Sequence, residues 1–297
     1  MGNFDGVHRG HQALVAQAVA DARASRGTAV VLTFDPHPSR VLAPERAPAT
    51  LMTLGQKAEW LGRLGVDRVA VLPFTAALAS QPAADFAQKV LHDALQATTV
   101  VVGAAFRFGQ GRAGDVALLR RLGRSLGFRV HGMRPVFHQG APISSSRVRE
   151  ALARGDAAGA AEMMGRPFAI DGTVVKGLGR GRTIGIPTAN IASVNEILPG
   201  NGVYACWLRV GGPERPVWPA VANVGRRPTF GGTDTTVEAH VIGVDEDMYG
   251  QPARLAFETR LRPEETFPDA AALVAQIRRD VERARDDLRA AGIRDGI

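Results

Sequence analysis

The first 135 residues alternate helical and strand patterns. After residue 9, apolar residues recur every three to four positions, which predicts an amphipathic helix that ends at Gly27. The stripe consists of Leu14, Val15, Ala18, Val19 and Ala22. Continuous apolar runs of strand length lie at 28–34, 68–74, 99–103 and 128–133. Helical patterns cover 56–64, 84–95 and 115–126, and a further helix spans 147–153. Because parallel strands covered on both faces are apolar throughout, this order predicts a doubly wound α/β domain.

The pattern changes at Gly165-Arg166-Pro167. Beyond it, short β-rich runs separated by Gly and Pro predict an antiparallel barrel or sandwich of five or six strands. The runs are 168–177, 202–210, 218–225, 235–243 and 253–261. A final helix carries an apolar stripe, with Arg and Asp expected on its other side and Gly292 as its stop. The stripe is Leu273, Ile277, Val281, Ala284 and Leu288. We therefore predict two domains, residues 1–164 and 165–297.

Composition narrows the class of protein. A chain of 297 residues with 45% apolar and 22% charged residues is typical of a globular protein. The net charge of +7 suits anionic partners such as nucleotides, flavin phosphates or nucleic acid, but only 6% of residues are aromatic, which disfavours base-stacking surfaces. The single Cys206 excludes an intramolecular disulfide. Without a long apolar run or a secretory leader pattern, we expect a cytoplasmic protein with no membrane partner.

The opening GNFDGVHRGH places three glycines and two histidines before the first helix. Free N–H groups and the helix dipole at such a terminus attract phosphate. His8 and His11 are three residues apart, so both imidazoles can lie on one helical face and donate to the same polyphosphate. A pair of surface histidines is the plainer interpretation, and the glycines and the helix start argue against it.

At this point the chain resembles the nucleotidyltransferase superfamily. Its HxGH motif is read here as 8–11, and its second signature appears as ISSSRVR at 143–149, where a helix begins. The resemblance makes His8, His11 and Arg149 catalytic candidates, and Ser144 and Ser145 phosphate ligands. Serine hydroxyls that cap a helix and a guanidinium fork suit the leaving pyrophosphate.

Two loops that follow predicted strands narrow the resemblance. FDPHP occupies 34–38 and VVGAAFRFGQGRAGD occupies 101–115. Together with the opening loop they resemble the FMN adenylyltransferase module of the prokaryotic bifunctional riboflavin kinase/FAD synthetase family. This implies a Rossmann-like nucleotidyltransferase domain that transfers adenylyl from ATP to FMN without a covalent enzyme intermediate. The resemblance implies ATP contacts at Gly2, Phe4, Asp5, Gly6 and Gly10, and flavin contacts at Phe34, Pro36, His37 and Phe106.

The chain departs from that family in two ways. The family has a strand before its opening loop, whereas here Met1 directly precedes Gly2, so we expect a sheet without its usual first strand. Family members also carry Asp or Asn at the position of Ala105, whose methyl group cannot hydrogen-bond a ligand. Either the true start lies upstream or the chain is shortened, and a shortened chain predicts an inactive or aggregation-prone first domain. Ala105 predicts an impaired adenylyltransferase function.

In the second half, KGLGRGRTIGIPTAN at 176–190 interleaves glycines with basic residues, which lets backbone amides approach phosphates. A flexible basic turn is the plainer interpretation. The candidate ATP contacts are Gly177, Gly179, Gly181, Arg182, Gly185 and Pro187. Thr188 and Asn190 point to one side of a strand-like segment and offer oxygen ligands for Mg²⁺, or cap a turn.

Several motifs between 166 and 290 occur in the order found in the riboflavin kinase module. They are GxGxGR, PTAN, LPGNGVYA, ANVGRRPTF, VEAHV, MYG and LRPEETF. The resemblance implies a six-stranded flavokinase barrel that binds MgATP at the glycine loop. It also implies that Glu238 is the catalytic base, and that Arg262 and Phe267 lie near the flavin. Alternation of Val237 and Val241 places Glu238 and His240 on one side of their strand.

We predict a bifunctional enzyme that phosphorylates riboflavin to FMN and adenylylates FMN to FAD, with riboflavin, FMN and ATP as small-molecule partners and Mg²⁺ as cofactor. Its oligomeric state, a homo-oligomer included, stays open. One alternative is that only the kinase works, so that FMN accumulates without FAD. A second is a flavin- or nucleic-acid-binding regulator, for which steeply salt-dependent binding would be evidence.

Overall fold

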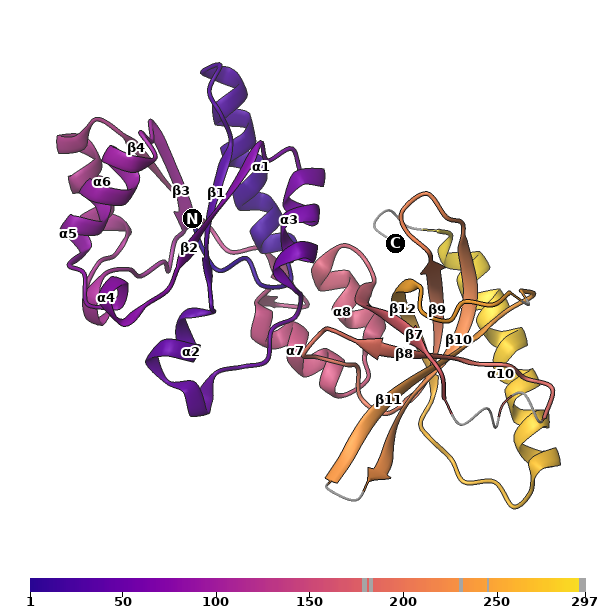
Figure 1. The fold of residues 1–297 in the computed structure, drawn as a ribbon. Helices are drawn as coiled ribbons and strands as arrows, with labels where there is room; N and C mark the ends of the chain where they lie inside the picture. Colours follow the sequence, from indigo (N-terminus) through magenta and orange to yellow (C-terminus); the bar gives the residue numbers. More distant parts are fainter. Residues whose placement is uncertain (178–180, 182–183, 230–231, 245, 294–297) are drawn as a thin grey trace. The chain divides into compact units, whose positions relative to one another are not determined.

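The computed structural model describes residues 1–177, 181, 184–229, 232–244 and 246–293 (Figure 1). At 226–229 and 232–234 it describes the backbone alone. The chain divides into two compact units, Met1–Ser144 and Ser145–Ile297. Each unit is described by itself.

The first unit contains two pairs of parallel strands. Strand β1 (Val30–Asp35) pairs with β2 (Arg68–Pro73), and β3 (Thr99–Gly103) pairs with β4 (Arg129–Met133). The terminal amine of Met1 donates to Val101 O on β3 at 3.1 Å, and Gly2 N donates to Leu32 O on β1 at 3.1 Å. The first two residues therefore bridge the strand pairs. The predicted α/β architecture is confirmed, as two parallel pairs rather than one continuous sheet.

Helices pack on these strands to form two apolar cores. Helix α1 (Arg9–Ala24) and helix α3 (Leu54–Arg63) cover β1, while α5 (Ala83–Phe86), the π-helical segment η2 (Ala87–Ala94) and α6 (Val116–Leu126) cover β3. All four predicted helices of this half are present. The shorter elements are α2 (Pro38–Leu42), η1 (Pro44–Arg46), α4 (Ala76–Ala79), η3 (Gln110–Arg112), β5 (Phe137–His138) and β6 (Ala141–Pro142).

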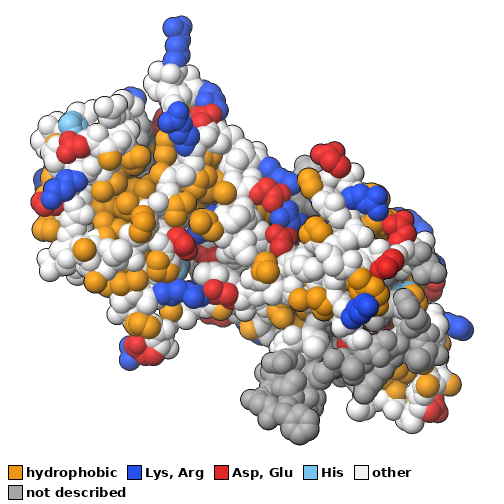
Figure 2. Space-filling view, viewed as in Figure 1, with side chains coloured by type: hydrophobic (Ala, Val, Ile, Leu, Met, Phe, Trp, Pro, Cys, Tyr) orange, Lys and Arg blue, Asp and Glu red, His pale blue; other side chains and the backbone are white. Residues whose placement is uncertain are grey.

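The strands are not equally covered. The middle residues of β1 and β3 are buried, whereas β2 is half-buried to exposed along its length, with Val71 39% exposed. Figure 2 shows hydrophobic side chains gathered on the visible face of this unit. The prediction that every strand is covered on both faces is therefore wrong for β2 and β4, neither of which has a buried residue, because the apolar cores gather on the middle of β1 and β3.

The second unit begins with two helices, α7 (Ser145–Ala153) and α8 (Ala157–Met164). The sequence analysis did not predict α8, because its Ala and Met residues show only a weak helical period. Helix α8 packs on strands β7 and β12 of the barrel. The division after Ser144 thus groups both helices with the barrel. As a functional boundary, 164/165 stays a prediction, and β7 begins close to it at Phe168.

Six antiparallel strands close a barrel in the order β10-β11-β8-β7-β12-β9. Their bounds are β7 Phe168–Val175, β8 Ala189–Ser193, β9 Gly202–Val210, β10 Val217–Thr229, β11 Gly232–Val241 and β12 Pro252–Arg262. The interior is filled by large apolar side chains such as Phe168, Tyr204 and Phe257. The expected six-stranded barrel is confirmed, and β8 supplies the strand that the five apolar runs did not include.

Helix α10 (Ala270–Ala291) lies on the outside of the barrel, where Ala284 and Leu288 pack on Val203 and Trp207. Asp269 caps its N-terminus through Ala272 N, and Gly292 stands at its C-cap with a φ of 68°, as predicted. The expectation that its Asp residues lie on the exposed side is wrong for Asp280, which is 4% exposed. An arginine on β12 accounts for this burial.

Candidate active sites

The two histidines of the first unit lie together at the start of α1. His8 is 5% exposed and is the N-cap of the helix, because its Nδ1 accepts from His11 N at 3.3 Å. The two rings stack with centroids 3.7 Å apart and 15° between their planes. Since Nδ1 of His8 accepts, its ring proton is assigned to Nε2, which leaves an N–H donor on the other edge of the ring. The structure thus brings together the predicted pair.

The loop before these histidines has an unusual backbone. Phe4, Gly6 and Val7 all have positive φ, at 49°, 82° and 39°, and a β-branched residue rarely adopts that region. A β-carbon on Gly6 would lie 2.7 Å from Leu51 Cδ1. Asp5 is buried and accepts from Leu51 N at 2.9 Å. Residues held in strained conformations cluster at ligand-binding sites, and here they shape a loop that leads into a helix terminus.

This loop is tied to the FDPHP segment by a histidine. His37 Nε2 lies 3.0 Å from Asn3 Nδ2, and His37 Nδ1 lies 2.6 Å from Ser39 Oγ. Sequence reasoning assigned His37 to the flavin and did not single out Asn3. His37 therefore joins the opening loop to the FDPHP segment, and its predicted flavin contact stays a prediction.

The other predicted flavin contacts lie on the two strand-end loops. Phe34 is half-buried and meets Phe74 edge-on at 5.6 Å, and Pro36 is exposed. Phe106 stacks on Phe108 with centroids 5.7 Å apart, and Ala105 beside it is exposed. These aromatic pairs give both loops a fixed apolar surface. Their contact with a flavin stays a prediction.

A lysine that the sequence analysis missed lies near the opening loop. Lys57 is on α3 and is half-buried. Burial lowers the pKa of its ammonium group, an effect that the carboxylates of Asp5 and Asp35 partly oppose. A cation at this place adds to the positive potential that the helix terminus already provides.

The chain passes from the first unit to the second within the ISSSRVR segment. Ser144 is the last residue of the first unit, and α7 begins at Ser145. Arg149 is half-buried on that helix. The predicted serine-rich helix start is confirmed, and the ligand contacts of Ser144, Ser145 and Arg149 stay predictions.

In the barrel, the glycine loop and the PTAN segment meet next to β8. A β-carbon on Gly177 would overlap the side-chain amide of Asn190, so only glycine fits against this amide without a shift. Gly181 O accepts from Ile186 N at 2.8 Å. Pro187 O lies 2.8 Å from His240 Nδ1, a contact that fixes PTAN to β11. Gly185 has a φ of 76°, and Gly179 and Arg182 lie outside the described residues.

Strand register places three polar side chains in one row on the outer face of the barrel. Glu238 on β11 stands opposite Asn190 on β8 and opposite Asn223 on β10. Directly opposed residues of antiparallel strands share a face and have Cβ atoms about 5 Å apart. Val237, Ala239 and Val241 are buried while Glu238 and His240 are half-buried, which confirms the predicted alternation.

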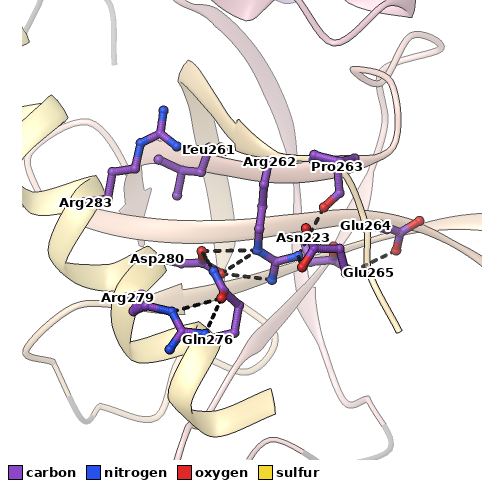
Figure 3. Close-up of polar contacts among 10 residues, drawn as sticks. All are labelled: Asn223, Leu261, Arg262, Pro263, Glu264, Glu265, Gln276, Arg279, Asp280 and Arg283. Carbon is purple, nitrogen blue, oxygen red and sulfur yellow. Dashed lines mark hydrogen bonds and ion pairs between the residues drawn. The ribbon is translucent and has the colours of Figure 1, made fainter. Parts of the chain in front are cut away.

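The same row continues to β12. Asn223 is opposite Val203 on β9, and Val203 is opposite Arg262. In Figure 3 the guanidinium of Arg262 points at Asp280 of α10, whose Oδ2 lies 2.9 Å from Nη2 and 3.0 Å from Nε. Arg262 also lies over the Phe267 ring, 5.5 Å from its centroid. The sequence analysis named Asn190, Glu238 and Arg262 separately, and the strand register adds Asn223 between Glu238 and β9.

Asn223 and Asp280 were missed by sequence reasoning, although each leaves a signal. Asn223 is an amide between Ala222 and Val224 in an apolar strand. Asp280 is three residues after Ile277 and four before Ala284, which is stripe spacing. A polar residue at an apolar position of a regular element is either paired or functional.

The residues in place suit Mg²⁺ bound together with phosphates. Thr188 and Asn190 offer a hydroxyl and an amide oxygen, and Glu238 stands opposite Asn190. Mg²⁺ prefers oxygen ligands, and with nucleotides it takes few from the protein. Within the described residues no group of three or more His, Cys, Asp or Glu forms a metal cage. None of the described helices has the length and hydropathy needed to cross a membrane.

Comparison with known proteins assigns families to both halves of the chain. Residues 1–147 match the FAD synthetase family, and residues 164–288 match the riboflavin kinase family. A bifunctional riboflavin kinase/FMN adenylyltransferase of Escherichia coli (strain K12) is 40% identical over 96% of this chain and 91% of that protein. The protein of the same name from Pseudomonas fluorescens is 39% identical, with the same coverage.

A more distant relative and a solved structure agree with these matches. The bifunctional riboflavin kinase/FMN adenylyltransferase of Listeria monocytogenes serovar 1/2a is 35% identical over 96% of this chain and 90% of that protein. A crystal structure from Streptococcus pneumoniae, described as a macrolide-efflux protein, matches with a TM-score of 0.88 and 30% identity. It covers 96% of this chain and 92% of that one, so the order of both domains is shared.

Proposed function

The chain belongs to the bifunctional riboflavin kinase/FMN adenylyltransferase family, and from this premise we propose which of its residues carry each reaction. Both activities are those of the chain: riboflavin is phosphorylated to FMN, and FMN is adenylylated to FAD. ATP is the co-substrate of both. We place the enzyme in the cytoplasm. Its cysteine, Cys206, is buried and forms no disulfide, which suits a reducing compartment, and its substrates are ATP and flavins.

For the kinase reaction, the observation that carries the proposal is the row Asn190–Glu238–Asn223. Glu238 accepts the proton of the ribityl 5′-hydroxyl as this oxygen attacks the γ-phosphorus of ATP. The Glu238 carboxylate lies on a strand between the amides of Asn190 and Asn223, which supports a fixed position. To accept the proton, this carboxylate must come within hydrogen-bond distance of the hydroxyl. The described glycines of the loop, Gly177, Gly181 and Gly185, together with Pro187, border the phosphates.

Thr188 and Asn190 would hold Mg²⁺ beside the phosphates. When bound, the ion neutralises charge on the phosphate oxygens. His240 fixes the carbonyl of Pro187, and Gly177 leaves room for the Asn190 amide, so both candidate ligands are held by their neighbours. The flavin ring lies toward Arg262 and Phe267.

For the adenylyltransferase reaction, His8 and His11 donate to the phosphates of ATP. Stacking of their rings and the cap on α1 hold both imidazoles in place before any ligand arrives. Preorganised donors of this kind stabilise the charge that develops during phosphoryl transfer. Ser144, Ser145 and Arg149 bind the leaving pyrophosphate, while Phe34, His37 and Phe106 contact FMN.

A time course with the purified chain, MgATP and either riboflavin or FMN tests the proposal, with flavins separated by chromatography. We expect FMN and then FAD from riboflavin, and FAD from FMN. FMN without FAD would support the kinase-only alternative, which the family matches over both halves do not favour. A folded protein that forms neither product would refute both site assignments.

A further inference from the structure

We propose that the Lys57 ammonium binds the phosphate group of FMN in the adenylyltransferase site, at the place where this phosphate meets the α-phosphate of ATP. The inference rests on the proposed function of the first unit and adds a binding residue to it. The contacts that carry it all lie within this unit.

The packing of α3 directs Lys57 toward the opening loop. Lys57 is four residues before Leu61, so both side chains lie on one face of the helix. Leu61 is fully buried and belongs to the same apolar cluster as Phe4 and Val7 of the opening loop. Long side chains on a helix lean toward its N-terminus. The Lys57 side chain therefore extends along this cluster toward the end at which α3 begins.

That end of α3 is held against the loops at the carboxyl end of β1. Asp5 of the opening loop accepts from Leu51 N at 2.9 Å, just before the helix. The Thr33 hydroxyl, on β1, donates to Asn3 O at 3.1 Å. Asn3 Nδ2 lies 3.0 Å from His37 Nε2 of the FDPHP segment. Both loops and the start of α3 thus gather where open α/β sheets bind their ligands.

The Lys57 ammonium is a cation without a partner in this region. It interacts through its charge with Asp5 of the opening loop and Asp35 of the FDPHP segment, but within the described residues it forms no hydrogen bond or ion pair. Lys89, the other lysine of this unit, is exposed and pairs with Asp85 at 3.1 Å. A half-buried ammonium without such a partner suits an anion that arrives with a substrate.

The charges assigned to the site leave one phosphate without a cation. The phosphates of ATP are assigned two histidines, two serines and Arg149. The residues assigned to FMN are apolar apart from His37, so none of them is a permanent cation. The FMN phosphate carries close to two negative charges at neutral pH and must approach the anionic α-phosphate of ATP. A cation next to it offsets the repulsion between the two groups.

The position of Lys57 suits the transfer step. An oxygen of the FMN phosphate attacks the α-phosphorus of ATP, the bond from that phosphorus to the oxygen bridging to the β-phosphate breaks, and pyrophosphate leaves with the electron pair. Lys57 neither gives nor takes a proton. Its ammonium holds the attacking phosphate in place and offsets its charge. Because riboflavin has no phosphate, the same contact distinguishes FMN from riboflavin in this unit.

Lys57→Met in the full-length chain tests the inference, because methionine keeps a flexible side chain and removes the charge. We expect kcat/KM for FMN in FAD formation to fall about 10- to 100-fold, the worth of one charged hydrogen bond. The KM for ATP and the rate of FMN formation from riboflavin should change less than about twofold. Lys89→Met is the matched control, since it removes an exposed lysine of the same unit, and we expect unchanged FAD formation.

Thermal stability separates substrate binding from a structural role. Burial penalises the charged form of Lys57, so Lys57→Met should melt at the same temperature as the unaltered chain or higher while it uses FMN poorly. A lower melting temperature, with normal use of FMN at temperatures where the variant is folded, would mean that Lys57 only balances Asp5 and Asp35.

Lys57→Arg tests whether the charge is what matters. Arginine keeps a cation that binds phosphate, and we expect this variant to recover most of the kcat/KM for FMN that Lys57→Met loses. An arginine variant no better than the methionine variant would contradict the proposal.

Failure of this inference is distinct from failure of the proposed function. If the unaltered chain forms no FAD from FMN, the function proposed for the first unit is wrong. If it forms FAD, and Lys57→Met does so with the same kcat/KM for FMN, Lys57 is not a ligand of FMN. A raised KM for ATP with an unchanged KM for FMN would assign the ammonium to ATP and would also overturn the inference.

Discussion

The two units build their candidate sites from different parts of the chain. In the first unit the ligand-binding elements are loops and a helix terminus, with strained backbone at Phe4 and Val7 and stacked histidines at the start of α1. In the barrel a glycine loop borders the phosphates, and the proposed base Glu238 and its neighbours Asn190 and Asn223 are side chains on strands, ordered by register. One site depends on backbone conformation, and the other depends on strand pairing.

This difference matches the two folds. Parallel strands end at one edge, where loops and helix N-termini collect and bind phosphates through N–H groups. The interior of this closed barrel is filled by side chains such as Phe168, Tyr204 and Phe257, so its candidate site lies on the outer face of the strands. Sites built on strands are held by many hydrogen bonds, whereas a loop site depends on a few glycines and caps.

The largest expected effect separates the two sites by chemistry. Glu238→Gln should lower the rate of FMN formation by about 10²- to 10⁴-fold, the usual contribution of a general base, and should spare FAD formation from FMN. His11→Ala should do the reverse, with a loss of about 10²- to 10³-fold in FAD formation. Chromatographic assays of both reactions on each variant measure this. Loss of both activities from either change would contradict separate sites.

A smaller effect tests the claim that the first site depends on backbone conformation. Gly6 has a φ of 82°, and a β-carbon there would meet Leu51 at 2.7 Å. Gly6→Ala should therefore destabilise the first unit by about 1–3 kcal/mol and lower FAD formation more than FMN formation. Denaturant unfolding and the two assays measure this.

Gly62→Ala is the control for that change. Gly62 is exposed on α3, and nothing lies within 4 Å of an added β-carbon. We expect it to stabilise the unit by about 0.5–1 kcal/mol, because alanine loses less backbone entropy in a helix. Equal destabilisation by both substitutions would mean that the loop conformation at Gly6 is not special.

The smallest effect concerns the barrel interior at alkaline pH. Burial raises the pKa of Tyr204 from 10.0 to about 12, and burial also raises the pKa of Cys206 well above its usual 9.0. Between pH 10 and 12 the unfolded chain releases the Tyr204 proton while the folded barrel keeps it. The free energy of unfolding therefore falls as pH rises through this range.

Tyr204→Phe removes that ionisation. Because the Tyr204 hydroxyl donates to Gly200 O, the variant should be about 1 kcal/mol less stable at pH 8. Its disadvantage should shrink toward pH 12, since only the unaltered barrel carries the titrating hydroxyl. Denaturant unfolding followed by the fluorescence of Trp207 and Trp218 reports on the barrel. A constant difference between pH 8 and 12 would contradict the raised pKa.

The local pattern of the sequence determined much of this protein. Spacing of apolar residues predicted α1, α3, α6 and α10, and alternation placed Glu238 and His240 on one side of β11. Glycines and caps marked where elements end, as at Gly292. These features depend on neighbours within a few positions, and such contacts are encoded by local order along the chain.

Only the tertiary structure decided which distant residues meet. Asn223 and Glu238 are neighbours through the register of β10 and β11, which sequence alternation does not give. Asp280 was read as a solvated charge because periodicity cannot identify a partner 18 residues away on another element. The bridge that Met1 and Gly2 make between β1 and β3 also joins residues far apart in sequence. Pairings of this kind depend on how the packed elements fit together, and a local sequence pattern does not determine this packing.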